Sequence, residues 1–117
     1  MKTYTVKISR LDYEIINRVR EIREKKGISQ RDLSELMNLS KSFVGKVEAL
    51  GQPDKYSIRH LTLIATALKL KSLDELLPKA IPDQDIIEVV YQKVPKLNKA
   101  GVESKQLEES IVEIKAI

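Results

Sequence analysis

Apolar residues change their spacing along the chain, and each spacing predicts a different element. Between Lys2 and Ile8 every second residue is apolar, which predicts a short strand. After Ser9 the apolar residues recur every three or four positions, as on one face of a helix. Ser9 can cap this helix, and Gly27 can end it. The inward positions of the predicted helix are Leu11, Ile15, Ile16, Val19 and Ile22.

Four more helices are predicted, because a serine that can cap a helix start precedes each of four further segments. These serines are Ser29, Ser40, Ser57 and Ser72. Asn38 is expected to end the second helix, because asparagine tolerates the left-handed backbone conformation. The third helix then runs to about Ala49, residues 50–56 form a loop, and Pro78 ends the fifth helix.

The segment after residue 80 fits more than one structure. Its β-branched residues suit a strand, but their spacing also suits a helix: Ile86, Val89, Val90 and Val94. We favour a helix here, because Asp83 can cap it and Pro95 would end it. Residues 96–103 are expected to form a loop. The tail 107–117 fits either element, although its last residues alternate as in a strand.

Composition and charge narrow the class of protein. Cysteine is absent, which excludes disulfides, a thiolate zinc site and a thiol nucleophile, and fits a reducing cytoplasm. We expect a cytoplasmic protein without membrane contact, because no signal-peptide run or bilayer-spanning segment is present. Residues 1–80 hold 16 Lys and Arg against 10 Asp and Glu, whereas residues 81–117 hold 5 against 7. The basic N-terminal part suits a surface that faces phosphates.

Residues 30–49 have the pattern that two short helices need when a tight turn joins them. A small residue must stand where the helices cross, and Ser34 supplies it. A residue able to take a positive φ must stand in the turn, and Asn38 supplies it. Apolar residues occupy the positions where the helices touch each other and the core: Leu33, Leu39, Val44 and Val47. The spacing predicts a helix-turn-helix.

The chain resembles the Cro/repressor-like (XRE) helix-turn-helix family over about residues 10–78. The diagnostic residues are Gly27, Ile28, Ser29 and Gln30, then Leu33 and Ser34, and finally Val44, Val47 and Glu48. Asn38 replaces the glycine usual at the turn, and the loop 50–56 differs from the commoner Asn-Gly ending. The resemblance implies a mainly α fold: a five-helix lambda-repressor-like DNA-binding domain in residues 1–80, with a short N-terminal strand. Residues 81–117 are a C-terminal extension outside the resemblance.

The resemblance places DNA contacts at the start of the second helix and on the third, the recognition helix. Gln30 is expected to clamp a phosphate, and Arg31 either reaches a phosphate or is an ordinary surface charge. Ser40, Lys41 and Ser42 would enter the major groove first. There Lys41 can bind guanine and Ser42 several base edges, while Ser40 caps the helix in either case.

Five further residues have a structural interpretation beside the DNA contact. Gly45 would let the helix approach DNA closely, and Lys46 would reach a base or a phosphate unless it is a solvated surface lysine. Phe43 either packs on a thymine methyl group or turns into the core. Lys55 and Tyr56 could touch phosphate from the loop; otherwise Tyr56 covers the edge of the core.

Residues that would indicate an enzyme or a metal site are missing from the sequence. His60 is the only histidine, and no His, Cys or carboxylate cluster has the spacing of metal ligands. The pairs Asp74-Glu75 and Glu108-Glu109 are adjacent residues, which diverge on a helix. No Gly-rich phosphate loop or nucleophile–base set is present. We therefore expect no enzymatic activity, no metal and no cofactor.

Two functions remain open at this point. The first is a transcriptional regulator that represses as a homodimer on a palindromic operator, because one recognition helix spans too few base pairs for specificity. The second is an antitoxin whose C-terminal segment neutralises a toxin, with DNA binding as autoregulation. Both assign double-stranded DNA to residues 1–80, and dimerisation or a protein partner to residues 81–117. A helix-turn-helix used only for protein contacts is a third interpretation.

Overall fold

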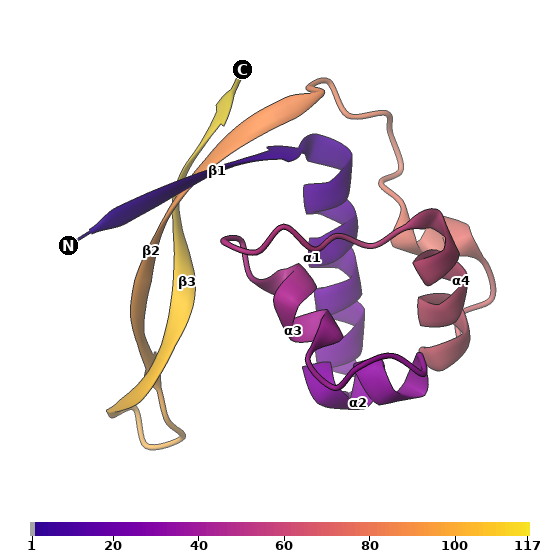
Figure 1. Ribbon diagram of the computed structural model, residues 1–117, viewed down its shortest axis with the longest axis horizontal. Helices are drawn as coiled ribbons and strands as arrows, with labels where there is room; N and C mark the ends of the chain where they lie inside the picture. Colours follow the sequence, from indigo (N-terminus) through magenta and orange to yellow (C-terminus); the bar gives the residue numbers. More distant parts are fainter. Residues whose placement is uncertain (1) are drawn as a thin grey trace. The chain divides into compact units, whose positions relative to one another are not determined.

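The computed structural model describes residues 2–117, which divide into two compact units (Figure 1). The helical unit is Ser9–Asp85. The strand unit joins the N-terminal residues up to Ile8 with the segment Ile86–Ile117. The two ends of the chain therefore belong to the same unit, although the whole helical unit separates them in the sequence.

Helix α1 (Arg10–Lys25) opens the helical unit and follows the predicted pattern, except that Leu11, expected to face inward, is 45% exposed. The Ser9 hydroxyl oxygen accepts a hydrogen bond from the Asp12 amide at 2.9 Å, which satisfies one of the free donors at the helix start. Gly27 follows the helix with a φ of 69°, the left-handed conformation that ends helices. The buried apolar residues of α1 are Ile15, Ile16, Val19 and Ile22.

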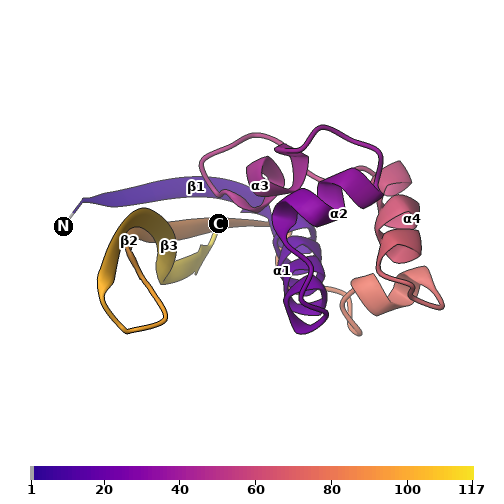
Figure 2. The same cartoon turned by 90° about the horizontal axis from the view of Figure 1, so that it is seen from below.

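Three more α-helices and a 3-10 turn complete this unit: α2 (Gln30–Leu36), α3 (Phe43–Glu48), α4 (Ile58–Ala67) and η1 (Leu73–Leu76). Helix α1 packs against α3 and η1, while α4 packs against η1 and α2. Helix α2 lies between α3 and α4 (Figure 2). The core side chains with at most 2% exposure are Val19, Leu33, Met37, Val44, Val47, Ile64, Leu68 and Leu76.

The prediction of a five-helix, mainly α fold is wrong, because residues 2–117 form four α-helices and a three-stranded sheet. The fifth predicted helix forms only the four-residue turn η1. Its start is as expected, since Ser72 and Glu75 complete a capping box. It stops after one turn because Leu77 precedes a proline and is extended, with φ −101° and ψ 152°.

The strand unit is a three-stranded sheet in the order β1 (Thr3–Ser9), β2 (Ile86–Leu97), β3 (Glu103–Ala116). Strand β1 confirms the alternating pattern at the N-terminus. Strands β2 and β3 form an antiparallel hairpin. The hairpin loop is closed by a hydrogen bond from the Asn98 amide to the Val102 carbonyl oxygen, at 2.9 Å.

The helix favoured for the segment after Asp83 is wrong, because this segment is strand β2. Ile87, Val89 and Tyr91 alternate as buried residues on one face, with exposures of 0%, 0% and 3%. Pro95 does not end a helix; it lies at an irregularity of the β2–β3 register, where a missing N–H is tolerated. The β-branched residues pack well on this pleated surface, and strand pairing satisfies their backbone groups.

One extra residue in β3 breaks the regular pairing of the hairpin. Val90 lies opposite Glu113 and Tyr91 lies opposite Ile111, so Val112 has no partner of its own on β2. On the other side of β2 the ring of Tyr4 stacks on Tyr91, with centroids 5.5 Å apart. Among residues 2–117, no helix combines the length and apolar content needed to cross a bilayer.

Candidate DNA-binding surface

Ser34 joins α2 to α3 by two hydrogen bonds of one hydroxyl group. Its Oγ donates to the Gln30 carbonyl oxygen at 2.9 Å and accepts from the Val44 amide at 3.0 Å. The side chain is fully buried where the two helices touch. A larger residue would separate the helices, and alanine would leave the buried Val44 amide without an acceptor. The small residue predicted at this position therefore also fastens the two helices together.

The turn between the two helices depends on Asn38. Its φ is 61°, as predicted, and its amide donates to the Glu35 carbonyl oxygen at 2.9 Å. The next amide, of Leu39, donates to the Ser34 carbonyl oxygen at 3.0 Å. These two bonds satisfy carbonyls at the end of α2 and reverse the chain within a few residues.

Helix α3 begins later than predicted. Its first helical residue is Phe43, and Ser42, not Ser40, holds the cap position, without a side-chain hydrogen bond to the helix. The Phe43 amide donates to the Ser40 carbonyl oxygen at 3.0 Å, so residues 40–43 form a tight turn that leads into the helix. Ser40, Lys41 and Ser42 are exposed on this turn. Ser40 and Ser42 can each precede a helix, so the sequence alone does not show at which of them α3 begins.

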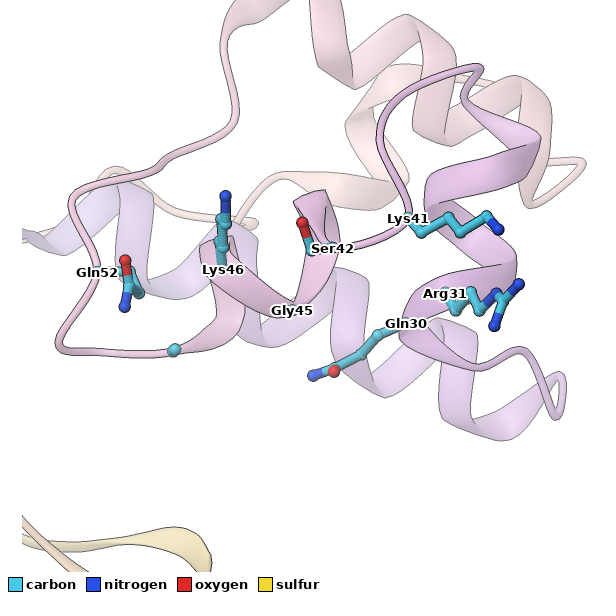
Figure 3. A pocket seen from close by; sticks show the side chains of 8 residues that line it. Gln30, Arg31, Lys41, Ser42, Gly45, Lys46 and Gln52 are labelled. Carbon is cyan, nitrogen blue, oxygen red and sulfur yellow. The ribbon is translucent and has the colours of Figure 1, made fainter.

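An open depression of about 370 Å³ lies on the outer side of α2 and α3 (Figure 3). Eight residues line it: Gln30, Arg31, Lys41, Ser42, Gly45, Lys46, Ala49 and Gln52. Three are cationic and none is acidic. Lys41 and Lys46 form no ion pair with a carboxylate of residues 2–117, whereas Arg31 donates to Glu35 at 3.2 Å. The depression is therefore a cationic surface that attracts anions.

The Gln30 side chain is oriented by a buried carboxylate. Its Nε2 donates to Oε1 of Glu48 at 2.9 Å. Because a carboxylate only accepts hydrogen bonds, the amide nitrogen must face Glu48. In Figure 3 the side chain extends from the start of α2 toward the side of α3 that carries Gly45. One N–H of Gln30 is thus used internally, and the second remains available at the depression.

Two arginines of α1 hold Glu48 in turn. Arg23 donates to both carboxylate oxygens, at 2.8 and 2.6 Å, and Arg20 donates to Oε1 at 3.1 Å. Burial by itself raises the pKa of Glu48. The hydrogen bonds from Arg23 and Gln30, with the charges of both arginines, outweigh that effect and hold this pKa below its ordinary value. The carboxylate therefore stays ionised and keeps accepting from Gln30.

Gly45 of α3 lies close to the Gln30 side chain. A Cβ on Gly45 would lie 3.2 Å from Oε1 of Gln30, closer than an ordinary van der Waals contact. The sequence led us to expect that Gly45 gives room for DNA. The structure shows that Gly45 also gives room for Gln30.

Four of the predicted DNA-binding residues do not line the depression. Phe43 is half-buried against the His60 ring, with centroids 4.7 Å apart, and contacts Tyr56 at 6.0 Å. Tyr56 is 9% exposed, and its hydroxyl has no hydrogen-bond partner among residues 2–117. The Lys55 ammonium donates to two carbonyl oxygens of its own loop. Ser40 lies outside the depression, on the turn before α3.

Neither Gln52 nor the ion-pair network beneath Gln30 was predicted from the sequence. Gln52 lies in the loop after α3, where its amide donates to the Ala49 carbonyl oxygen at 3.1 Å. A polar residue three positions after a recognition helix was the available signal. Arg23 and Glu48 are far apart in sequence, so no local spacing links them. Among residues 2–117 no group of three or more metal-ligating side chains is assembled.

The family model HTH_3, helix-turn-helix, matches residues 19–76. The restriction-modification controller protein C.AhdI from Aeromonas hydrophila is 39% identical over 55% of this chain and 92% of that chain, with a TM-score of 0.47. The hypothetical transcription factor NHTF from Neisseria is 25% identical over 58% and 75%, with a TM-score of 0.51. The curated proteins contain no match.

The paired helices α2 and α3, with their exposed cationic surface, define a DNA-binding helix-turn-helix protein. The chain belongs to the helix-turn-helix family of the XRE, or Cro/C1, type, and is a DNA-binding regulator of transcription. The resemblance drawn from residues 27–48 is confirmed. Its partner is double-stranded DNA, and family membership points to a regulator and away from an enzyme.

Proposed function

We propose that this regulator is a repressor that binds a two-fold symmetric operator as a homodimer, with α3 in the major groove. The observation that carries the proposal is the cationic depression formed by α2, α3 and the turn between them. Its lysines have no carboxylate partners among residues 2–117 that would compete with phosphates or base edges. Displacement of counterions from DNA by such groups supplies a large part of the binding free energy.

The residues divide by expected role according to their place in the depression. Gln30, oriented by Glu48, and Arg31 are proposed to contact the phosphate backbone from α2. Lys41 and Ser42, on the turn that leads into α3, are proposed to reach base edges. Lys46 lies one turn further along and completes the contact. Phe43 is proposed to be structural, because it packs on His60.

Selection of bound sequences from a random DNA pool tests this function. We expect two inverted half-sites with centres one helical turn, about 10 base pairs, apart. Fluorescence anisotropy on the selected site should show affinity that falls steeply with salt concentration and exceeds that for unrelated DNA by about a thousandfold or more. Equal affinity for all sequences would contradict an operator-specific regulator, and a selected site without inverted repeats would contradict the dimer.

A reporter gene decides the direction of regulation. The selected operator is placed across a promoter, and expression is measured with and without the protein. A repressor lowers the signal and leaves a promoter without the operator unchanged. A rise in expression would replace repression by activation and leave the DNA-binding proposal intact.

A further inference from the structure

Strand β3 forms an edge of its sheet and carries an unusual amount of exposed apolar surface. In the sheet order β2 lies between β1 and β3, so among residues 2–117 the outer side of β3 has no neighbouring strand. The strand is 14 residues long. Its exposed apolar residues are Leu107 (60%), Ile111 (44%), Val112 (53%) and Ile114 (39%). A long apolar edge strand is a template for pairing with another strand.

The exposed isoleucines continue the buried face of the sheet. Ile111 lies opposite Tyr91 and Ile114 lies opposite Val89. Directly paired residues of antiparallel strands point to the same face. Because Tyr91 and Val89 are buried, this face is apolar from the centre of the sheet to its outer edge. A strand added at β3 would extend that face.

We propose that the occupant is β3 of a second copy of this chain, paired antiparallel about a two-fold axis. This rests on the homodimer of the proposed function and assigns its contact surface. A two-fold axis perpendicular to the sheet keeps each residue on its own face, so only residues of one face can lie opposite each other. Because Val112 is an extra residue, Ile111 and Ile114 share a face although they are three positions apart.

We place the axis between Val112 and Glu113, because this register meets the condition and brings both isoleucines of each copy into the contact. Ile111 of each copy then lies opposite Ile114 of the other, which buries two apolar pairs in the centre of the contact. The two sheets become one continuous sheet, and both outer edges of β3 find hydrogen-bond partners. The apolar faces of the two copies meet at the four isoleucines, and Glu109 borders this apolar centre on the same face.

Part of the charge pattern of β3 agrees with this register. The Glu113 side chains of the two copies come close to each other at the axis, where Lys115, 3.8 Å from Glu113 of its own strand, offsets their repulsion. On the face that does not carry the isoleucines, Ser110 comes to lie opposite Lys115 of the second copy, and Glu108 is the next residue on that face. Lys115 therefore approaches Glu108 of the other copy diagonally, within reach of a long side chain, and the symmetry repeats this pair. An unrelated strand would need both the isoleucine spacing and the charge pattern, which a second copy supplies by symmetry.

The molar mass of the protein in solution shows whether it dimerises, and a variant of β3 shows whether the dimer forms through this strand. Multi-angle light scattering should give twice the chain mass of 13.3 kDa for the wild type and 13.3 kDa for Ile111→Lys at the same concentration. A lysine at the centre of the junction would be buried twice without a carboxylate opposite. Ile81→Lys, at a residue that is 92% exposed in the helical unit, adds the same charge elsewhere and should remain dimeric. Circular dichroism must show that all three proteins are folded.

Cysteine crosslinking tests the register directly, because the chain has no cysteine of its own. Ile111→Cys and Ile114→Cys are prepared separately and then mixed under mild oxidation. Directly opposed strand residues lie within the Cα distance of a disulfide. We expect a crosslinked dimer in the mixture and little or none with either variant alone.

Each outcome separates this inference from the proposed function. A wild-type dimer that survives Ile111→Lys and gives no crosslink in the mixture overturns the β3 surface, and leaves a dimeric regulator with another contact. A monomeric wild type that still selects one half-site overturns both the surface and the dimer, but not DNA recognition. A β3 dimer that binds no DNA upholds the surface and overturns the proposed function.

Discussion

Gly45 and Gln30 meet in the cationic depression of α2 and α3: a Cβ on Gly45 would lie 3.2 Å from Oε1 of Gln30. The other end of the same amide, Nε2, donates to Glu48 at 2.9 Å. The Gln30 side chain is thus confined between the backbone of α3 and a buried carboxylate. In the proposed complex, such confinement lowers the conformational entropy that Gln30 loses on contact with a phosphate.

Gly45→Ala is expected to weaken operator binding while the fold stays as stable or becomes more stable. Alanine favours a helix interior over glycine by about 1 kcal/mol, but the new methyl group displaces the Gln30 amide. We expect the dissociation constant for the operator to rise about tenfold, or 1.4 kcal/mol. Anisotropy titration gives the affinity, and a thermal melt gives the stability.

A double-mutant cycle with Gln30→Ala shows whether this effect passes through Gln30. If it does, Gly45→Ala has little further effect once Gln30 is removed. Full additivity of the two losses would show instead that the methyl group clashes with DNA itself.

Glu48→Gln is expected to destabilise the fold by about 3 kcal/mol, because it leaves the Arg23 guanidinium buried without its carboxylate. It should also weaken operator binding, since Gln30 loses its charged acceptor. Urea unfolding measures the free energy. Glu24→Gln, at an exposed carboxylate of α1, is the matched control and should change stability by less than about 0.5 kcal/mol.

The Glu48 carboxylate is also expected to account for part of the stability that the fold loses at acid pH. Since the pKa of Glu48 is lower in the folded state, its contribution to stability is complete above the ordinary carboxylate pKa and is lost as the pH falls through the folded value. Urea unfolding at a series of pH values from 6 downward should show this loss, below about pH 4.5, in the wild type and a flatter profile in Glu48→Gln. Parallel profiles would assign the acid sensitivity to other carboxylates.

Lys41→Ala is expected to change which bases are preferred in the half-site. If Lys41 reads a base, the best site loses about 1–3 kcal/mol and discrimination at one position relaxes. Repeating the selection with the variant shows the altered position. Lys79→Ala removes an exposed lysine of the helical unit that does not line the depression, and should leave the selected site unchanged. A uniform loss over all sequences would make Lys41 a phosphate contact.

Protonation of His60 is expected to lower the stability of the fold as the pH falls from about 7 to 5. Its Nδ1 accepts a hydrogen bond from the Ser57 amide at 2.9 Å, which only a neutral ring can do. Burial, and then the charge of Arg59, lowers the pKa of His60, so stability is retained above the ordinary histidine pKa and lost as the pH falls through the folded value. His60→Gln keeps an acceptor for the cap and removes the titration. Its melting temperature should vary less over this range, and an equal variation would show that His60 is not responsible.

The helix-turn-helix could be predicted because its requirements are local. Ser34 and Asn38 are needed at fixed distances from their neighbours, by the size limit at a helix crossing and by a φ of 61° in the turn. The strand β1 was equally accessible, since alternation over seven residues has few competing explanations. The later start of α3 was not predicted, because Ser40 and Ser42 are both able to precede a helix.

The sequence by itself therefore determined the short-range features: the helix caps, the turn at Asn38 and the cationic residues around α3. Tertiary structure alone decided the rest. Residues 86–94 became a strand because β1 and β3 lie on either side to pair with them, and Gln30 is oriented because α1 brings Arg23 and Arg20 to Glu48. The strand and the orientation of Gln30 both depend on contacts between segments distant in sequence. The free energy of such contacts cannot be predicted from the spacing of neighbouring residues.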